Sequence, residues 1–446
     1  MTDQDDNNPV SENGHTVPRP RHDADKGREP QLVAGQLGRR LFSMNALVER
    51  IESAFVEEHG EDSPELREAD TSTKRLKLVL ATIDYVLSVE SIQVSTPEKV
   101  DLINRVYSNL FGYGPLDALF LDESVTTISL DGADKAAVRY GHGELVSLGP
   151  IFQNEDHLRR AVNRLLVDAG AELRDDQPYI ETGLLVGERP VSVNLVSPPI
   201  SYQLNLDIRV HPPIIPTPDD LIASGFMIAQ AADLLESIIA SPHGLLIVGD
   251  PESGKTTLLS ILSQWLPNPE KTIAVERAGE LRLPSGVQKL MTRWPLGDQP
   301  GISFGEQIGN ALENQPACIL LDEVRSDEPH TISPLLEMTD APRQIWSFRG
   351  TIFAKRLQSS LGMLARRADL GQGDDLVRAL YQRLPFVVSV NRVNDSLRLW
   401  SIGEWQFKHS AEYPTYTLLM HTENGELKLT GEHPVQELNL PEKFWR

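Results

Sequence analysis

Eight consecutive residues near the middle of the chain have the types and spacing of a phosphate-binding loop. They are Gly249, Asp250, Pro251, Glu252, Ser253, Gly254, Lys255 and Thr256. The two glycines let the backbone curl so that successive N–H groups point at phosphate oxygens. The Lys255 ammonium can reach β- and γ-phosphates, and the Thr256 hydroxyl, followed by Thr257, is placed to bind Mg²⁺. The loop therefore predicts a nucleotide site.

The segments on either side of this loop have the pattern that such a site requires. Residues 245–248 are a short apolar run, typical of a buried strand. Residues 256–266 have apolar side chains at helical spacing. A helix that starts at the loop directs its positive N-terminal end toward the bound anion. An ordinary glycine-containing turn between a strand and a helix is the alternative.

Two further apolar runs end in carboxylates. Residues 319–321 precede Asp322 and Glu323, about seventy residues after the loop. In P-loop proteins such an Asp holds Mg²⁺ and the Glu can polarise the attacking water. Residues 273–275 precede Glu276, with Glu280 four residues later. We expect this strand close to the loop strand, where either carboxylate could orient water or Mg²⁺. Acids that mark a strand's exit into solvent are the alternative in both cases.

Composition narrows the class of protein. The 446 residues carry 42 Lys and Arg against 64 Asp and Glu, a net charge of −22, which argues against a nucleic-acid translocase. No apolar run approaches the length of a membrane span, and no signal peptide is expected. Cys318 is the single cysteine, so an intrachain disulfide is excluded. This composition fits a reducing cytoplasm.

The pattern along the chain predicts six segments. Residues 1–30 form a disordered acidic tail, 31–110 a helical region that starts near Leu32, and 111–211 an α+β domain. Residues 212–218 are a proline-rich linker. Residues 219–405 alternate helix and strand, which predicts a three-layer α/β domain with a largely parallel sheet. Residues 406–446 return to short strands, as a β appendage.

Several motifs resemble those of the secretion and pilus-motor ATPases, which serve type II and type IV secretion and type IV pili. The chain is most similar to the tight-adherence (Tad/Flp) branch, of the CpaF type. The motifs are residues 110–116 (Leu-Phe-Gly-Tyr-Gly-Pro-Leu), 187–189 (Gly-Glu-Arg), 206–209 (Leu-Asp-Ile-Arg) and 322–325 (Asp-Glu-Val-Arg). The resemblance implies an α/β fold, with a RecA-like P-loop ATPase domain at 219–405 preceded by the smaller α+β domain.

The resemblance also implies roles and partners. Arg189 and Arg209 would reach the phosphates of ATP, and guanidinium groups suit this task because they form bidentate contacts. For Arg189, a surface charge facing an acidic neighbour is the alternative. Mg²⁺ and ATP are the implied cofactors. A homo-hexamer is implied, working in the cytoplasm at the inner face of the membrane with a platform protein, without direct contact to nucleic acid.

Two positions depart from the family pattern. Arg277 stands where the family has Asp in its acidic box, and Arg349 stands at the position of a histidine. Arginine can bridge phosphate charge but cannot titrate as histidine does. We therefore expect ATP binding at Lys255 with Arg349 nearby, and hydrolysis assisted by Glu323 or Glu276 together with Lys255 and Arg209. The alternative is a subunit that binds ATP but hydrolyses it weakly. A DNA-pumping ATPase ranks third.

Overall fold

The computed structural model describes residues 32–34, 41–60, 63–141, 143–393, 396–407 and 413–445. The chain divides into two compact units, Met1–Val106 and Tyr107–Arg446, and each is considered by itself. The predicted tail at 1–30 lies outside the described residues.

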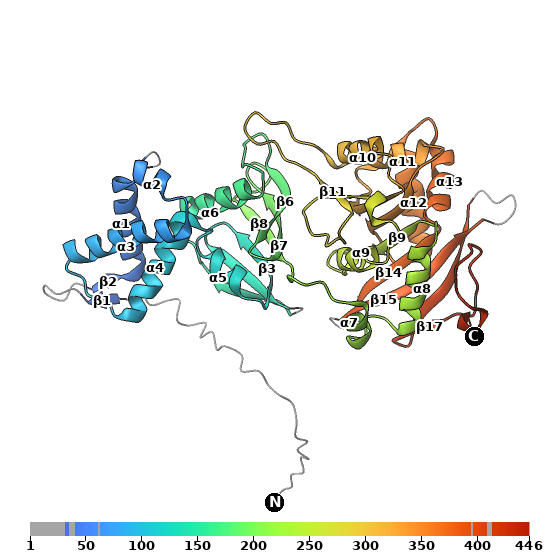
Figure 1. Cartoon of the computed structure of the whole chain (residues 1–446), viewed down its shortest axis with the longest axis horizontal. Helices are drawn as coiled ribbons and strands as arrows, with labels where there is room; N and C mark the ends of the chain where they lie inside the picture. The colour runs from blue at the N-terminus through green and yellow to red at the C-terminus, as the bar shows by residue number, and fades with distance from the viewer. Residues whose placement is uncertain are drawn as a thin grey trace, which may run out of the picture. The chain divides into compact units, whose positions relative to one another are not determined.

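The first unit is mostly helical. A two-stranded antiparallel pair, β1 (Leu32–Ala34) and β2 (Leu41–Ser43), precedes the helices. The helices are α1 (Met44–Glu58), α2 (Pro64–Glu68), α3 (Ser72–Val89) and α4 (Thr96–Phe111), the last of which runs into the second unit (Figure 1). Helical structure starts later than the sequence predicted. Ser43 is extended and its hydroxyl accepts a hydrogen bond from the Ala46 N–H, so it caps a helix whose first residue is Met44.

The second unit begins with an α+β domain built on a six-stranded antiparallel sheet. The sheet order is β5-β4-β3-β8-β7-β6. The elements are α5 (Leu116–Leu121), β3 (Val125–Asp131), β4 (Lys135–Tyr140), β5 (Leu145–Gly149), α6 (Glu155–Asp168), β6 (Tyr179–Val186), β7 (Arg189–Val196) and β8 (Asn205–Val210). Leu158, Val162 and Leu165 of α6 are fully buried in one core with Ile128 and Val193 of the sheet. This apolar face of α6 fixes the helix on the sheet.

A nine-stranded sheet forms the centre of the following α/β domain. Its order is β11-β10-β12-β13-β9-β14-β15-β16-β17. The strands are β9 (Leu245–Gly249), β10 (Thr272–Glu276), β11 (Gln288–Met291), β12 (Cys318–Val324), β13 (Arg343–Arg349), β14 (Phe386–Val393), β15 (Ser396–Gln406), β16 (Thr415–Glu423) and β17 (Glu426–Leu429). In this sheet order, the first six strands, from β11 through β9 to β14, run parallel to one another. The last three, β15, β16 and β17, extend the sheet by antiparallel pairing.

Helices cover both faces of this sheet, so the domain has three layers (Figure 1). One core contains the buried side chains of α8 (Ala229–Ala240) and α9 (Lys255–Ser263). The opposite core contains those of α10 (Phe304–Glu313), α11 (Ser333–Glu337), α12 (Ala354–Ala368) and α13 (Gly373–Arg383). Shorter elements are α7 (Pro218–Ala223), η1 (Pro269–Lys271), η2 (Pro329–Ile332) and η3 (Glu442–Trp445). The predicted fold class is confirmed.

Two details of the sheet differ from the sequence predictions. The strands after residue 406, β16 and β17, are not an appendage, because β16 pairs with β15 and β17 pairs with β16, so both extend the central sheet. Leu419 and Met420 of β16 lie in the same core as β9, so burial of apolar area holds these strands to the domain. In addition, β10 is not next to the loop strand, since β12 and β13 lie between β10 and β9.

Candidate nucleotide-binding site

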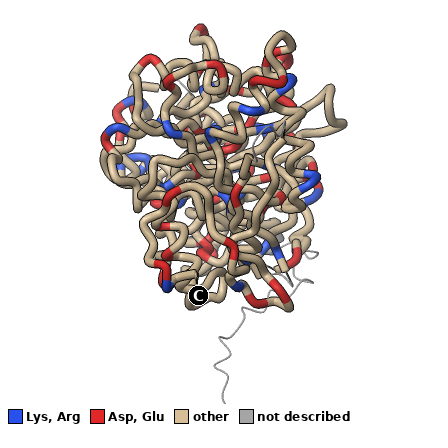
Figure 2. The backbone as a smooth tube through the Cα atoms, turned by 90° about the vertical axis from the view of Figure 1, so that its right-hand side faces the viewer, with Lys and Arg blue, Asp and Glu red and all other residues tan. Residues whose placement is uncertain are grey.

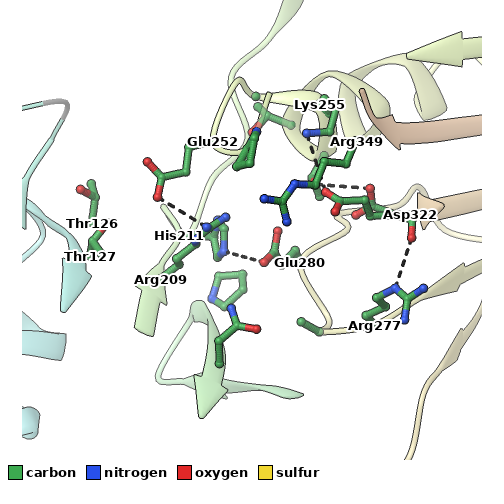
Figure 3. A pocket seen from close by; sticks show the side chains of 18 of the residues that line it. Thr126, Thr127, Arg209, His211, Glu252, Lys255, Arg277, Glu280, Asp322 and Arg349 are labelled. Atoms are coloured by element: carbon green, nitrogen blue, oxygen red, sulfur yellow. Dashed lines mark hydrogen bonds and ion pairs between the residues drawn. The ribbon is translucent and has the colours of Figure 1, made fainter. Parts of the chain in front are cut away.

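A cavity of about 780 Å³ lies over the phosphate-binding loop (Figure 3). Its walls come from both domains of the second unit. The α/β domain supplies the loop, the ends of β12 and β13, and the segment after β10. The α+β domain supplies β3, β4, β6, β7 and β8, and the proline-rich linker closes one side. The carboxyl ends of parallel strands are where α/β folds bind their ligands.

The loop has the backbone that a phosphate site needs. Gly249 ends β9, and a Cβ there would lie 2.6 Å from the Val390 carbonyl oxygen. Gly254 has φ +88°, a left-handed conformation, and caps α9 without a side chain. The first N–H groups of α9 therefore have no side-chain cap, and the buried Ser253 hydroxyl has no hydrogen-bond partner among the described residues. These donors suit the oxygens of a phosphate.

Lys255 is held in place by the loop itself. Its side chain is only 4% exposed, and its Nζ donates to the Asp250 carbonyl at 2.9 Å. Glu323 Oε2 lies 3.7 Å from the same nitrogen. Burial lowers the pKa of Lys255, while the charges of Glu323 and Asp322 oppose that change. A buried ammonium that these two carboxylates only partly compensate is well suited to bind a polyphosphate.

Asp322 and Thr256 supply a pair of oxygen donors that fits Mg²⁺. The Thr256 hydroxyl donates to Asp322 Oδ1 at 3.3 Å, and Ser347 donates to the same oxygen. Burial and the neighbouring carboxylates, Glu280 foremost, together raise the pKa of Asp322 to about 7, against the hydrogen bond from Ser347. No cluster of three or more His, Cys, Asp or Glu suited to a metal occurs within the described residues. Mg²⁺ suits such a sparse set, because it keeps waters and takes phosphate oxygens as ligands.

Glu323 faces the cavity and is positioned by two arginines. Arg325 Nε lies 3.6 Å from its carboxylate. Arg277 Nε donates to the Glu323 carbonyl at 3.2 Å, and Arg277 also pairs with Glu328 at 2.7 Å. The Arg277 guanidinium lies over the Phe304 ring, 4.3 Å from its centroid. Arg277 therefore anchors the backbone that carries Glu323.

Three other predicted residues also line the cavity. Arg209 Nη2 lies 3.4 Å from Glu252, and its buried Nε has no hydrogen-bond partner among the described residues. Arg349 and Thr257 lie at the wall formed by β13 and α9. The exposed Arg349 guanidinium makes no hydrogen bond or ion pair with any described residue, so it is available to an anion.

Glu280 lines the cavity but is already partnered. Its Oε1 lies 3.5 Å from His211 Nε2. Burial would raise the pKa of Glu280, but the hydrogen bond and charge of His211 outweigh it and lower the pKa to about 2. Glu280 is therefore an ionised carboxylate and a weak candidate for taking up a proton.

Two predicted residues are placed away from the cavity. Glu276 is 1% exposed, pairs with Lys289 Nζ at 2.5 Å and accepts from the Leu281 N–H at 2.8 Å. Its position on β10, which β12 and β13 separate from β9, explains why it does not reach the loop. The Arg189 guanidinium donates to four backbone carbonyls, those of Phe120, Asp122, Val125 and His211. The guanidinium of Arg189 is therefore committed to backbone carbonyls and does not line the cavity.

The cavity also contains residues that sequence reasoning did not select. Arg139 of β4, Arg392 of β14, Arg325 and His211 all line it. Arg325 stands in a motif that was noticed, and His211 opens the linker, so both had a local signal. Arg139 and Arg392 had none, because each comes from a strand far from any motif and reaches the loop only in the folded chain.

Part of this chain is similar to known proteins. Residues 154–335 match the family model described as Type II/IV secretion system protein. Over 227 residues the chain is 30% identical to a Mycobacterium tuberculosis protein named "Putative conjugal transfer protein", covering 50% of this chain and 64% of that protein. It is 27% identical over 198 residues to "Type IV secretion system protein PtlH" of Bordetella pertussis, covering 39% and 58% respectively.

Among solved structures, the Legionella pneumophila ATPase DotB is 14% identical and has a TM-score of 0.47, over 68% of this chain and 82% of that chain. The chain spans less than two thirds of the length of the two relatives named above. The region that matches the family model includes the phosphate-binding loop and the pair of acids at the end of β12. Within the described part of the chain, no helix has both the length and the apolar character needed to cross a bilayer.

Proposed function

We propose that this chain is an ATP-hydrolysing motor subunit that powers assembly of a Tad or type IV-like pilus, or protein secretion across a bacterial envelope. The observation that carries the proposal is the meeting of Lys255 with Glu323, and of Thr256 with Asp322, at one end of a parallel sheet. The match of residues 154–335 to type II/IV secretion system proteins supports the same class of machine.

Each group in the cavity has a role in this reaction. Lys255 and Arg209 contact the β- and γ-phosphates and stabilise the negative charge that develops there, and Glu323 orients the attacking water. Arg349 adds a further cation on the β13 side. Thr256 and Asp322 would hold Mg²⁺, which supplies positive charge against the phosphate oxygens. A change of angle between the two domains about the linker at 212–218 then converts turnover into movement.

Phosphate release tests the site directly. Wild type should release inorganic phosphate from MgATP, and Lys255→Ala should lose at least about a hundredfold of that rate. Lys271→Ala is the matched control, because Lys271 is an exposed lysine of η1 in the same domain. Equal rates in wild type and Lys255→Ala would reject this cavity as the catalytic site.

The second candidate is a subunit that binds ATP but turns it over slowly within a mixed ring. The arginines at 277 and 349 favour it, since they stand where the resembling family has an aspartate and a histidine. Tight MgATP binding without a burst or steady-state turnover, in wild type and in Arg349→His, is its signature. Steady-state turnover of ATP by the wild-type protein, with no other subunit present, excludes this candidate.

We propose a homo-hexamer that works in the cytoplasm, peripheral to the inner face of the membrane and beside a platform protein there. ATPase rate measured against protein concentration, beside mass photometry, tests the ring: the rate per chain should rise with the hexamer population.

Contact with nucleic acid is not part of this proposal. In the view of Figure 2 acidic and basic residues are interspersed, and the net charge is −22. Submicromolar binding of duplex DNA at moderate salt would overturn that point.

A further inference from the structure

Glu252 sits in an unusual backbone conformation within the phosphate-binding loop. Its φ is +60°, in the left-handed region that glycine adopts freely and that side chains with a Cβ disfavour. A glutamate at such a position needs compensating contacts, and those contacts lie in the cavity itself.

The Glu252 carboxylate bridges two arginines of the α+β domain. Arg139 Nη1 of β4 lies 2.7 Å from Oε2, and Arg209 Nη2 of β8 lies 3.4 Å from Oε1 (Figure 3 labels Glu252 and Arg209). Arg392 Nη2 of β14 donates to the Glu252 carbonyl at 3.3 Å. Three arginines from three strands therefore converge on one loop residue.

These three side chains are partly shielded from water. The side chains of Glu252, Arg139 and Arg209 are 32%, 23% and 30% exposed. Burial raises the pKa of Glu252, but the hydrogen bond from Arg139 and the charge of Arg209 outweigh it, so the pKa lies below its usual value. All three side chains line the same cavity as Lys255 and Thr256.

We propose that Glu252 is an intramolecular competitor of the nucleotide phosphates for Arg139 and Arg209, and thereby sets the affinity of the cavity. A carboxylate and a phosphate oxygen offer a guanidinium the same kind of acceptor, so a bound polyphosphate exchanges with Glu252. The exchange also releases the loop from its ionic tie to the α+β domain. This inference rests on the proposed nucleotide site and deepens it by naming a residue that restrains binding.

Calorimetric titration with MgADP tests the competition without hydrolysis. Glu252→Gln keeps the size of the side chain and removes its charge, so MgADP should bind about tenfold more tightly than to wild type. Glu252→Gly removes the carboxylate and also relieves the left-handed backbone, and it should shift affinity in the same direction. Glu313→Gln is the matched control, since Glu313 is an exposed acid on α10 and its loss should leave the affinity unchanged.

A second substitution separates competition from a structural role. In wild type, Glu252 occupies the Arg139 guanidinium, so Arg139→Gln should weaken MgADP binding only a little. In the Glu252→Gln background the Arg139 guanidinium is free, so the same substitution should weaken MgADP binding several-fold. The competition is overturned, and the nucleotide site is not, by the following result. Both folded Glu252 variants bind MgADP as tightly as wild type or more weakly, and Arg139→Gln has the same effect in both backgrounds. Failure of wild type to bind MgADP at all would instead reject the nucleotide site, and this inference with it.

Discussion

The ammonium nitrogen of Lys255 lies 3.7 Å from the nearer carboxylate oxygen of Glu323. One residue belongs to the phosphate-binding loop after β9 and the other to the end of β12, with β13 between the two strands. The cation that we propose for the phosphate and the carboxylate that we propose for the attacking water thus face one another across the carboxyl edge of the sheet.

Glu323→Gln should retain MgATP binding and lose at least about a hundredfold in steady-state phosphate release, because the amide cannot polarise water as a carboxylate does. Calorimetry measures whether MgATP binding is retained, and a coupled assay of phosphate release measures whether turnover is lost. Asp327→Asn is the control, since Asp327 is an exposed acid that also lines the cavity. A variant with wild-type turnover would transfer the water-orienting role to another carboxylate.

Glu276→Gln should act on stability and not on turnover. The Gln can still accept from the Leu281 N–H but loses the ion pair with Lys289, which should lower the free energy of unfolding by about 1–2 kcal/mol. Urea denaturation measures this loss, and kcat of the folded enzyme should stay within about twofold of wild type. A fall in kcat as large as that of Glu323→Gln would restore Glu276 to the catalytic set.

Arg189→Ala should destabilise the α+β domain by about 2–4 kcal/mol, because it leaves buried carbonyl oxygens such as those of Phe120 and Val125 without donors. Its MgADP affinity should equal that of wild type. Arg209→Ala provides the contrast, with weaker nucleotide binding expected. Thermal denaturation and calorimetry on both variants separate the two roles, and a loss of affinity in Arg189→Ala without destabilisation would contradict this assignment.

His157 makes the α+β domain sensitive to acid. Burial lowers its pKa from 6.5 to about 4, and its ring contacts Asn109 Oδ1 at 3.1 Å and the Gln153 N–H at 3.4 Å, which suits the neutral form. The unfolded chain therefore binds a proton at higher pH than the folded chain. The stability from this group is full above pH 6.5 and is lost as pH falls toward 4, by about 3 kcal/mol.

Urea denaturation between pH 7 and pH 4.5 measures this dependence. His157→Gln should be less stable at pH 7 but should show a shallower loss of stability on acidification. An unchanged slope in the variant would assign the acid sensitivity to other groups.

Local sequence was sufficient wherever one short segment carried all the required information. The loop 249–256, its flanking strand and helix, and the acids at 322 and 323 were found because their backbone, charge and apolar spacing lie within a few residues of each other. The α+β domain at 111–211 was predicted for the same reason, since its apolar runs are short and bounded by turns.

Prediction was poorer where a side chain's partner lies far away in sequence. Glu276 and Arg189 had the right type and spacing for a site, yet one is neutralised by Lys289 and the other is consumed by backbone carbonyls. The strands after residue 406 were assigned to a separate appendage because the pairing of two strands across a sheet leaves no mark in either strand alone.

By itself, the sequence determined that a phosphate-binding loop sits on a parallel α/β sheet, with an Asp and a Glu at the end of a second strand. Only the tertiary structure decided which charges share the cavity. Strand order placed Glu323 beside Lys255 and kept Glu276 away, and the α+β domain brought Arg139 to Glu252 across more than a hundred residues. The physical reason is that an ionic contact depends on distance and desolvation, and both are set by packing between elements that the chain connects only indirectly.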